Sequence, residues 1–393
     1  MPRQYNNPGT TESSIGSQIR TDHYDRKALI ERQRERFFAP TANSVDLPKH
    51  TGKEIVKYHY VPLLDDANVN DEGIDASGTA SLNGNLYGSS KDIGTITGKL
   101  PVLTENGGMV NRVGFTRKEI RSDLRKFGFY SDYTKESMDF DSDKELEMHI
   151  RREAMNGAVE IDEDLTQIDL LTCGSVTRFA GVASSDDTMT GESGATVSEV
   201  DYDDFVRLNI TLDNNRDPKM IKYNTGTNAE DTRTIRNARI MYIGSELVPT
   251  IERMKDYHNN PAFISIEKYA GNIKTLNGEI GSIANFRIVL VPEMLNWSGV
   301  GATVATNGGY RATGGKYDVF PMLVVGAESY AVVGFNGSKG NRKFTIKHAK
   351  PESPESYAND RYGETGFSSL KWYYGFVCYR PERIAVIKSV ARL

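Results

Sequence analysis

Residues 142–173 read SDKELEMHIRREAMNGAVEIDEDLTQIDLLTC, and they carry the clearest secondary-structure pattern of the chain. Ser142 and Glu145 form a capping-box pair, which can satisfy backbone amides at a helix N-terminus. Apolar residues follow at the three- and four-residue spacing of one helix face: Leu146, Ile150, Ala154, Ala158, Ile161, Leu165 and Ile168. The pattern predicts a helix of about 30 residues, roughly 45 Å long, that ends near Cys173 and Gly174. A helix of this length spans a whole domain.

Two extended segments precede this helix, with a long polar stretch between them. In residues 52–63, GKEIVKYHYVPL, the aromatic residues Tyr58 and Tyr60 alternate with polar ones, which is the period of a half-exposed strand. Residues 112–133 contain VGFTRKEIRSDLRKFGFYSDY, which we expect to return antiparallel to the first segment. Residues 64–110 are rich in Asp, Asn, Gly, Ser and Thr and are too long for an ordinary loop. The sequence therefore predicts a projecting stem that rests on a neighbouring molecule.

The first fifty residues are polar and have the composition of an arm. Within them, residues 22–38, DHYDRKALIERQRERFF, predict a helix that stops before Pro40. This helix has too few apolar residues to form a core of its own, so it needs a partner surface. Its basic residues are interspersed with acidic ones, which leaves open both a solvated or inter-subunit face and a direct contact with nucleic acid.

The candidates for contact between subunits lie in these N-terminal segments. They are Arg32, Arg34, Arg36, Phe37 and Phe38 in the arm, Tyr58 and Tyr60 in the stem, and Lys91 and Lys99 in the polar stretch.

The second half of the chain alternates helices with short apolar strands. Asp201 is placed to cap a helix that carries Phe205, Leu208 and Leu212. The Gly-rich residues 298–316 are expected to form a surface or contact loop. Runs of β-branched and aromatic residues predict strands within residues 238–244, 285–294, 317–335 and 369–391. The mixture of a long helix, a mixed unit and closing strands predicts an α+β fold.

Composition excludes several classes of protein. The formal net charge is -5, so the molecule lacks the basic excess of a protein that binds nucleic acid by bulk electrostatics. No apolar run approaches the length of a membrane span, and the first thirty residues lack the apolar segment of a signal peptide. We therefore expect a protein that is made and kept in a cytoplasm. Cys173 and Cys378 are far apart in sequence, which predicts two inert thiols rather than a disulfide framework or a zinc site.

No catalytic, cofactor or metal motif is complete. Residues 309–316 resemble a phosphate-binding loop, but Lys316 is followed by Tyr317 instead of Ser or Thr. A calcium-loop pattern that starts at Asp66 has Ser77 where the bidentate Glu belongs. We expect no enzyme and no cofactor. The alternative is an enzyme with an unrecognised site in the Gly-rich residues 298–316.

The order of several short motifs resembles a known family. The motifs are GKEIVKYHYVPLLDD (52–66), GFYSDYTKES (128–137), LLTCGSVTRFAG (170–181), RNARIMYIGSELVPTIERMKD (236–256), GEIGSIANFRIVLVPEM (278–294) and GFSSLKWYYGFVCYRPERIAVIKSVA (366–391). In this order they resemble the HK97-type major capsid proteins of tailed bacteriophages, and most of all the family from podophages that package a virion RNA polymerase. The resemblance covers most of the chain after residue 52.

The resemblance implies a division of the chain into four parts. These are an N-terminal arm (1–50), an extended E-loop (51–120, with its stem to about 133), a P-domain (121–200 and 346–393) with the spine helix 142–173, and an A-domain (201–345). It implies a structural subunit that assembles with itself as hexamers and pentamers of an icosahedral head around double-stranded DNA. The alternative is an accessory or decoration virion protein that binds a preformed shell.

The resemblance also implies partners and a location. The partners would be the portal protein, a scaffolding or decoration protein, and packaged DNA held by weak non-specific contact, with no membrane. The chain would be found in the virion and assembled in the cytoplasm of the bacterial host.

Overall fold

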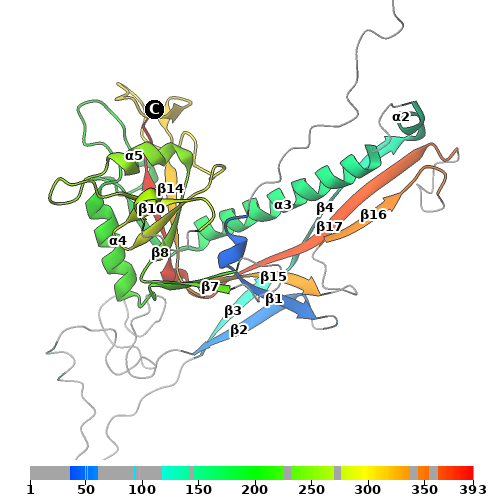
Figure 1. Ribbon diagram of the computed structural model, residues 1–393, viewed down its shortest axis with the longest axis horizontal. Coiled ribbons are helices and arrows are strands. Elements are labelled where there is room, and N and C mark those ends of the chain that lie inside the picture. Colours follow the sequence, from blue (N-terminus) through cyan, green and yellow to red (C-terminus); the bar gives the residue numbers. More distant parts are fainter. Residues whose placement is uncertain are drawn as a thin grey trace, which may run out of the picture.

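The structure is a computed structural model, and Figure 1 shows a compact body from which a long helix and a long strand extend side by side. It describes residues 36–48, 50, 52–60, 93, 97, 117–140, 146–224, 232–269, 276–336, 344–353 and 362–392. Helices and strands occur together in both parts of the molecule, which confirms the predicted α+β class.

The compact body is built on a seven-stranded sheet. Its strands, in spatial order, are β5 (Val176–Phe179), β18 (Ile384–Ser389), β14 (Phe320–Val325), β8 (Arg239–Ile243), β11 (Phe286–Leu290), β10 (Glu279–Ile283) and β9 (Ile264–Ser265). Every residue of the central strands β8 and β14 is buried, because both faces of the sheet are covered. Alternate side chains of β8 therefore belong to two different cores: Met241 and Ile243 to one, Ile240 and Tyr242 to the other.

Different elements cover the two faces of this sheet. Helix α4 (Tyr202–Asn214) places Phe205, Leu208 and Leu212 against one face, as the sequence predicts, and α5 (Val248–Arg253) lies on the same core. Asp201 caps α4 by accepting a hydrogen bond from the backbone of Asp204. The opposite face meets the C-terminal end of the long helix.

The elongated part consists of α3 (Leu146–Cys173) packed on a second sheet. This sheet has the order β1 (Asn43–Pro48), β15 (Tyr330–Asn336), β17 (Thr365–Cys378) and β16 (Phe344–Ala349), and β4 (Arg125–Thr134) also pairs with β17. The alternate residues Leu370, Trp372 and Tyr374 of β17 are buried in the core that contains Ala158 of α3. The helix therefore lies along one face of β17 (Figure 1).

The remaining elements are short. The strands β2 (Glu54–Tyr60) and β3 (Arg117–Asp123) pair with each other, as do β6 (Met220–Asn224) with β7 (Thr232–Arg236) and β12 (Ala312–Thr313) with β13 (Lys316–Tyr317). Helix α2 (Lys135–Phe140) follows β4. Single 3-10 turns are η1 (Ala39–Thr41), η2 (Asp186–Thr188), η3 (Ser245–Leu247), η4 (Ile266–Lys268) and η5 (Pro381–Arg383).

The predicted long helix is confirmed, although its buried face differs from the predicted stripe. Helix α3 ends at Cys173 as expected, and the predicted cap residues Ser142 and Glu145 lie outside the described residues. Ile161 and Ile168 are 40% and 47% exposed. The buried residues of the helix are Ala158, Val159, Asp162, Glu163, Thr166, Gln167 and Leu170. The helix therefore presents a largely polar face to its own molecule.

The sheet pairing also differs from the domain ranges that the sequence implied. Strand β15 falls within the predicted A-domain range 201–345, but it pairs with β17 of the elongated sheet. Strands β5 and β18 fall within the predicted P-domain ranges 121–200 and 346–393, but they belong to the sheet of the body. The reason is that the chain crosses between the two sheets after β14 and again after β17, so strands adjacent in sequence separate in space.

Candidate assembly surfaces

The strands β2 and β3 form an antiparallel stem, as the sequence predicts, but the second half of the predicted return segment, β4, pairs with β17 instead. The polar stretch 64–110 lies outside the described residues except for positions 93 and 97. One side of the stem faces solvent. The cross-strand pairs on this side, here called the stem face, are Val56 with Arg121, Tyr58 with Glu119, and Tyr60 with Arg117. The Arg117 guanidinium lies 4.1 Å from the centroid of the Tyr58 ring, and an Arg121 nitrogen lies 2.9 Å from a Glu119 oxygen. The stem face is therefore an aromatic and charged surface with its own internal contacts.

The other side of the stem attaches it to the molecule. Ile55 of β2 and Ile120 of β3 pack against a small core that contains Leu124 and Val377. The Lys57 ammonium, on the same side as Ile55 and Ile120, lies 3.7 Å from the centroid of the Tyr379 ring. Because this side is occupied, the alternation of the strands turns Tyr58 and Tyr60 outward, 48% and 55% exposed.

A group of buried hydrogen bonds holds the chain where the N-terminal arm joins the body. The Glu163 carboxylate of α3 accepts hydrogen bonds from the backbone amides of Phe37 and Phe38, each at 2.7 Å. The hydroxyl of Tyr242 donates to the Phe37 carbonyl at 3.0 Å, and that of Tyr330 donates to the Phe38 carbonyl at 2.6 Å. We call these five residues the arm clasp. It connects α3, the body sheet and the elongated sheet through one short segment.

The electrostatics of the arm clasp follow from its burial. Burial raises the pKa of Glu163, while the amides of Phe38 and Phe37 oppose the shift because they stabilise the charged carboxylate. Phe38 is fully buried, and its ring centroid lies 4.9 Å from that of Tyr242. The clasp thus combines a desolvated acid with aromatic packing.

The arm clasp corrects part of the predicted contact set. Phe37 and Phe38 fill the core of their own chain, with 6% and 0% exposure, so they are not available to another subunit. For residues 37 and 38 the partner surface is their own molecule, and the rest of the predicted arm helix, 22–35, lies outside the described residues. Arg36 is exposed at the edge of the clasp. The other candidates of the arm and the polar stretch lie outside the described residues: Arg32, Arg34, Lys91 and Lys99.

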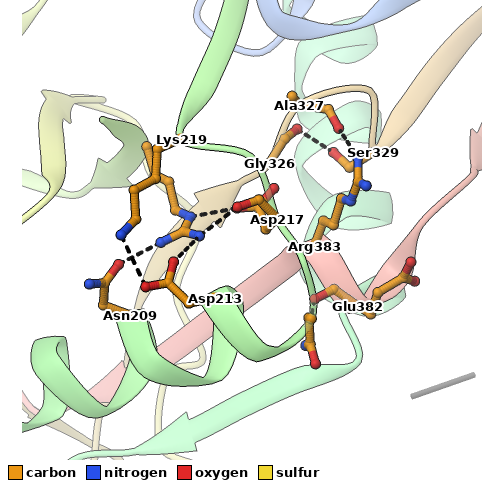
Figure 2. Close-up of polar contacts among 11 residues, drawn as sticks. Asn209, Asp213, Asp217, Lys219, Gly326, Ala327, Ser329, Glu382 and Arg383 are labelled. Carbon is orange, nitrogen blue, oxygen red and sulfur yellow. Dashed lines mark hydrogen bonds and ion pairs between the residues drawn. The ribbon is translucent and has the colours of Figure 1, made fainter. Parts of the chain in front are cut away.

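A buried polar network lies where the chain crosses between the two sheets (Figure 2). The Arg239 side chain, at the start of β8, is fully buried and contacts Asp217 at 2.6 Å and Asp213 at 2.7 Å. In Figure 2, Arg383 lies beside the turn between β14 and β15, where it donates to the Ala327 carbonyl at 3.1 Å. The Asn215 side chain at the end of α4 donates to the Glu382 carbonyl at 2.9 Å, so α4 is joined to the segment that crosses between the sheets after β17.

The Gly-rich loop 298–316 does not form an open phosphate cradle. The Glu192 carboxylate accepts the backbone amides of Ala305 and Thr306, each at 2.6 Å. The amide of Val304 donates to the Gly315 carbonyl at 2.9 Å. The amides of Gly309 and Tyr310 likewise donate to the Asn307 side chain. These five amides already have partners within the chain, so they are not free to bind an anion.

Within the described part of the chain, no group of three His, Cys, Asp or Glu side chains is placed to hold a metal ion. None of the helices in that part is long and apolar enough to cross a membrane.

Sequence reasoning missed the acceptor and donors of the arm clasp. Glu163 lies in the run EIDEDL, where every acidic residue looks like part of a solvated helix face. Tyr242 and Tyr330 lie in strands whose patterns indicate burial but not a hydrogen-bond partner. No local signal distinguishes these residues, because the segment they bind is more than a hundred residues away in sequence.

Comparison with known proteins gives a consistent result. No family model matches the chain. The major capsid protein of Pseudomonas phage KPP21 is 54% identical over 394 residues, which covers 100% of this chain and 98% of that protein. Among solved structures, the capsid of Ralstonia phage GP4 has a TM-score of 0.55 at 12% identity and covers 98% of this chain and 99% of its own. The capsid of cyanophage Pam1 has a TM-score of 0.50 at 14% identity, over 96% and 98%.

The identity and the structural likeness support different conclusions. The solved capsids are too distant in sequence to show more than a shared fold. The full-length identity to the protein of phage KPP21 shows the family. The chain therefore belongs to the bacteriophage major capsid proteins and has the HK97-type capsid fold.

Proposed function

We propose that this major capsid protein assembles as hexamers and pentamers into an icosahedral head that encloses double-stranded DNA. The observation that carries the proposal is the identity of 54% to the major capsid protein of phage KPP21 over the whole chain. The role is structural. The alternative of an accessory protein that binds a preformed shell has no support in the comparisons, because the full-length relative is a major capsid protein.

Within this proposal, each part of the molecule corresponds to a domain of the capsid fold. The compact body acts as the A-domain and the elongated part, with α3 as spine helix, acts as the P-domain. The stem of β2 and β3 acts as the base of the E-loop, and residues 1–35 continue the N-terminal arm beyond the arm clasp. Arg32, Arg34, Arg36, Lys91 and Lys99 stay as proposed contacts with neighbouring subunits.

The stem face supports the assignment to an inter-subunit contact. A two-stranded ribbon is marginally stable alone and usually needs further packing. Its inner side is attached to the molecule, whereas Tyr58 and Tyr60 present aromatic rings to solvent beside paired arginine side chains. Tyrosine and arginine are enriched at protein–protein interfaces. We infer that the stem face lies against another copy of the chain.

Assembly of this kind draws its free energy from many modest contacts. A closed shell repeats each contact by symmetry, so weak pairs add up over the particle. Arg117 and Arg121 are about half exposed in the isolated chain. Charged contacts at such positions are screened by salt, so assembly should depend on ionic strength. We further propose the portal protein, a scaffolding or decoration protein and weakly bound DNA as partners, and assembly in the bacterial host cytoplasm.

Electron microscopy of a stem-face variant tests the proposal. The variant Tyr58→Ser with Tyr60→Ser removes both exposed rings and should leave the circular dichroism spectrum and the unfolding midpoint unchanged, while closed shells are lost. The matched control is Tyr58→Phe with Tyr60→Phe, which keeps the rings and should still form shells. Shells formed by the serine variant as readily as by the wild type would contradict the role of the stem face. Wild-type chains that stay monomeric under all conditions would contradict the proposed function.

A further inference from the structure

The two cysteines lie at equivalent ends of two elements that are packed together. Cys173 is the last residue of α3, and Cys378 is the last residue of β17. Figure 1 shows α3 and β17 side by side, and both run toward the compact body. The chain then continues from α3 into β5 and from β17 through η5 into β18, and β5 and β18 pair in parallel. The two chain segments therefore stay adjacent before and after the cysteines.

Hydrogen bonds confirm this adjacency on both sides. One turn of helix before Cys173, the Asp169 carboxylate accepts a 2.7 Å hydrogen bond from the Tyr374 hydroxyl. Two residues after Cys173, the Ser175 amide donates to the Pro381 carbonyl at 3.1 Å. Alternate residues of a strand point to the same side, so Cys378 faces the same side of β17 as Tyr374. Both cysteines thus lie where α3 and β17 reach the body, against the same core.

The environment of the thiols is shared. Cys173 and Cys378 are half-buried, and both pack against the core that contains Leu170, Tyr330 and Ile384. The neighbouring Cys378 thiol and burial raise the pKa of Cys173. Both are free thiols in the structure.

We propose that Cys173 and Cys378 are a modification site, at which an intramolecular disulfide forms by exchange with a small-molecule disulfide such as oxidised glutathione. One cysteine loses its proton, and its thiolate attacks a sulfur of the small disulfide, which releases one small thiolate. The thiolate of the second cysteine then attacks the protein sulfur of this mixed disulfide and releases the second small thiolate. The two cysteines are oxidised, and the small disulfide is reduced to two thiols.

The bond would link the end of the spine helix to the end of β17. The loop that it closes contains most of the compact body, and a cross-link across a long loop restricts the unfolded chain strongly. Cytosolic thiols are kept reduced, so the bond is expected after the particle leaves the host cell. This timing rests on the proposed function, whereas the bond itself rests on the adjacency of the two chain segments and on the core that both cysteines share.

Disulfide formation should be slow at neutral pH and faster at higher pH. The thiolate is the attacking species, and the raised pKa of Cys173 keeps this thiol protonated at neutral pH. Exchange should therefore be faster at pH 9 than at pH 7 in the same glutathione buffer.

Thiol mapping of the full-length chain tests the proposal. The reduced protein is incubated with oxidised glutathione at both pH values, alkylated with iodoacetamide, and analysed by intact mass and by peptide mapping. We expect the wild type to lose both alkylation sites, to be lighter than the reduced chain by two hydrogen atoms, and to give one peptide that joins Cys173 to Cys378. Its unfolding midpoint should rise on oxidation and return on reduction.

The controls are Cys173→Ser and Cys378→Ser. Each retains one thiol, which should be alkylated or carry one glutathione, and neither should show the rise in midpoint. Alkylation of both cysteines in the wild type after incubation would overturn the proposal, as would a disulfide between two chains. Shells that assemble normally but keep both thiols would refute the disulfide alone, and a disulfide in chains that never form shells would refute the proposed function alone.

Discussion

The Nε atom of Arg239 lies 2.6 Å from a carboxylate oxygen of Asp217, and both side chains are completely buried. The pair lies where the chain crosses between the body sheet and the elongated sheet. A second carboxylate, that of Asp213, contacts the same guanidinium from α4. Breaking a buried pair by removal of one partner leaves an uncompensated charge, which is strongly destabilising.

We expect Arg239→Met to lower the free energy of unfolding by about 3–5 kcal/mol, because it leaves Asp217 buried without its cation. The measurement is urea unfolding of the unassembled full-length chain. Lys219→Met is the matched control, since Lys219 contacts Asp213 at 3.0 Å but its side chain is 36% exposed. Exposed pairs contribute roughly 0–1 kcal/mol, so this control should stay close to the wild type. Equal midpoints for Arg239→Met and the control would contradict the role of the buried network.

Removal of the Glu163 carboxylate, the acceptor of the arm clasp, should destabilise the folded chain. Glu163→Ala leaves the amides of Phe37 and Phe38 buried without a partner, which should cost roughly 2–5 kcal/mol for the two groups together. Glu163→Gln keeps an acceptor oxygen and should lose less than Glu163→Ala. Glu160→Ala, on the exposed side of the same helix, should lie within about 0.5 kcal/mol of the wild type. The three variants are compared by urea unfolding, and a Glu160→Ala loss as large as that of Glu163→Ala would count against the clasp.

The pH dependence of stability provides a separate test of Glu163. Its pKa in the folded chain is raised above the value of 4.5 by burial, so the folded state holds this proton to higher pH than the unfolded state does. The contribution of Glu163 to stability is therefore fully present below pH 4.5 and declines as the pH rises through the folded pKa. Glu163→Gln does not titrate, so we expect its stability relative to the wild type to improve as the pH rises through this window. Unfolding curves at a series of pH values, with Glu160→Gln as control, should show the trend; the opposite trend would refute it.

Two glycines should respond in opposite directions to alanine. A Cβ at Gly281, in β10, would overlap the Ile264 carbonyl oxygen and the Phe263 ring, so Gly281→Ala should destabilise by about 1–3 kcal/mol. A Cβ at Gly157, in α3, meets no atom within 4 Å, so Gly157→Ala should stabilise the chain by about 0.5–1 kcal/mol through helix propensity. Thermal unfolding of both variants measures the difference. A stabilising Gly281→Ala would show that β9 can move away from β10.

Two truncations separate the role of the arm from that of the clasp. Deletion of residues 1–35 leaves Phe37 and Phe38 in place, so we expect the body to fold with a near-native midpoint while shells are lost. Deletion of residues 1–42 also removes both aromatic side chains from the core, each worth about 3 kcal/mol or more when truncated, and should lower the midpoint sharply. Electron microscopy and thermal unfolding give the two readouts. Shells formed by the shorter truncation would contradict an essential arm.

Local patterns predicted the elements that depend on local interactions. The end of α3 at Cys173, the cap of α4 at Asp201 and the buried strand β8 all follow from spacing, capping and β-branched runs. The outward orientation of Tyr58 and Tyr60 follows in the same way from strand alternation. These features could be predicted because each is decided within a few residues.

The buried face of α3 could not be predicted in this way. The spacing rule favours Ile161 and Ile168, yet both are exposed to solvent by 40% or more, while Asp162 and Glu163 are buried. Hydrophobic periodicity assumes that a helix packs against apolar side chains. Glu163 instead meets two backbone amides of the arm segment, which offset part of the cost of burying its carboxylate. The buried face of α3 is therefore polar because it packs against the arm segment, which lies outside the helix sequence.

The sequence by itself determined the α+β class, the long helix, the antiparallel stem and the resemblance to a capsid family that the comparison with phage KPP21 then confirmed. Only the tertiary structure decided that β15 joins the elongated sheet and β18 the body sheet, that Phe37 and Phe38 belong to the core of their own chain, and that Cys173 and Cys378 border one core. Helices and strands depend on residues a few positions apart, so they can be recognised from the periodic spacing of apolar residues in the sequence. The arm clasp, the Arg239 network and the thiol pair join distant segments through hydrogen bonds and packing, which produce no such spacing.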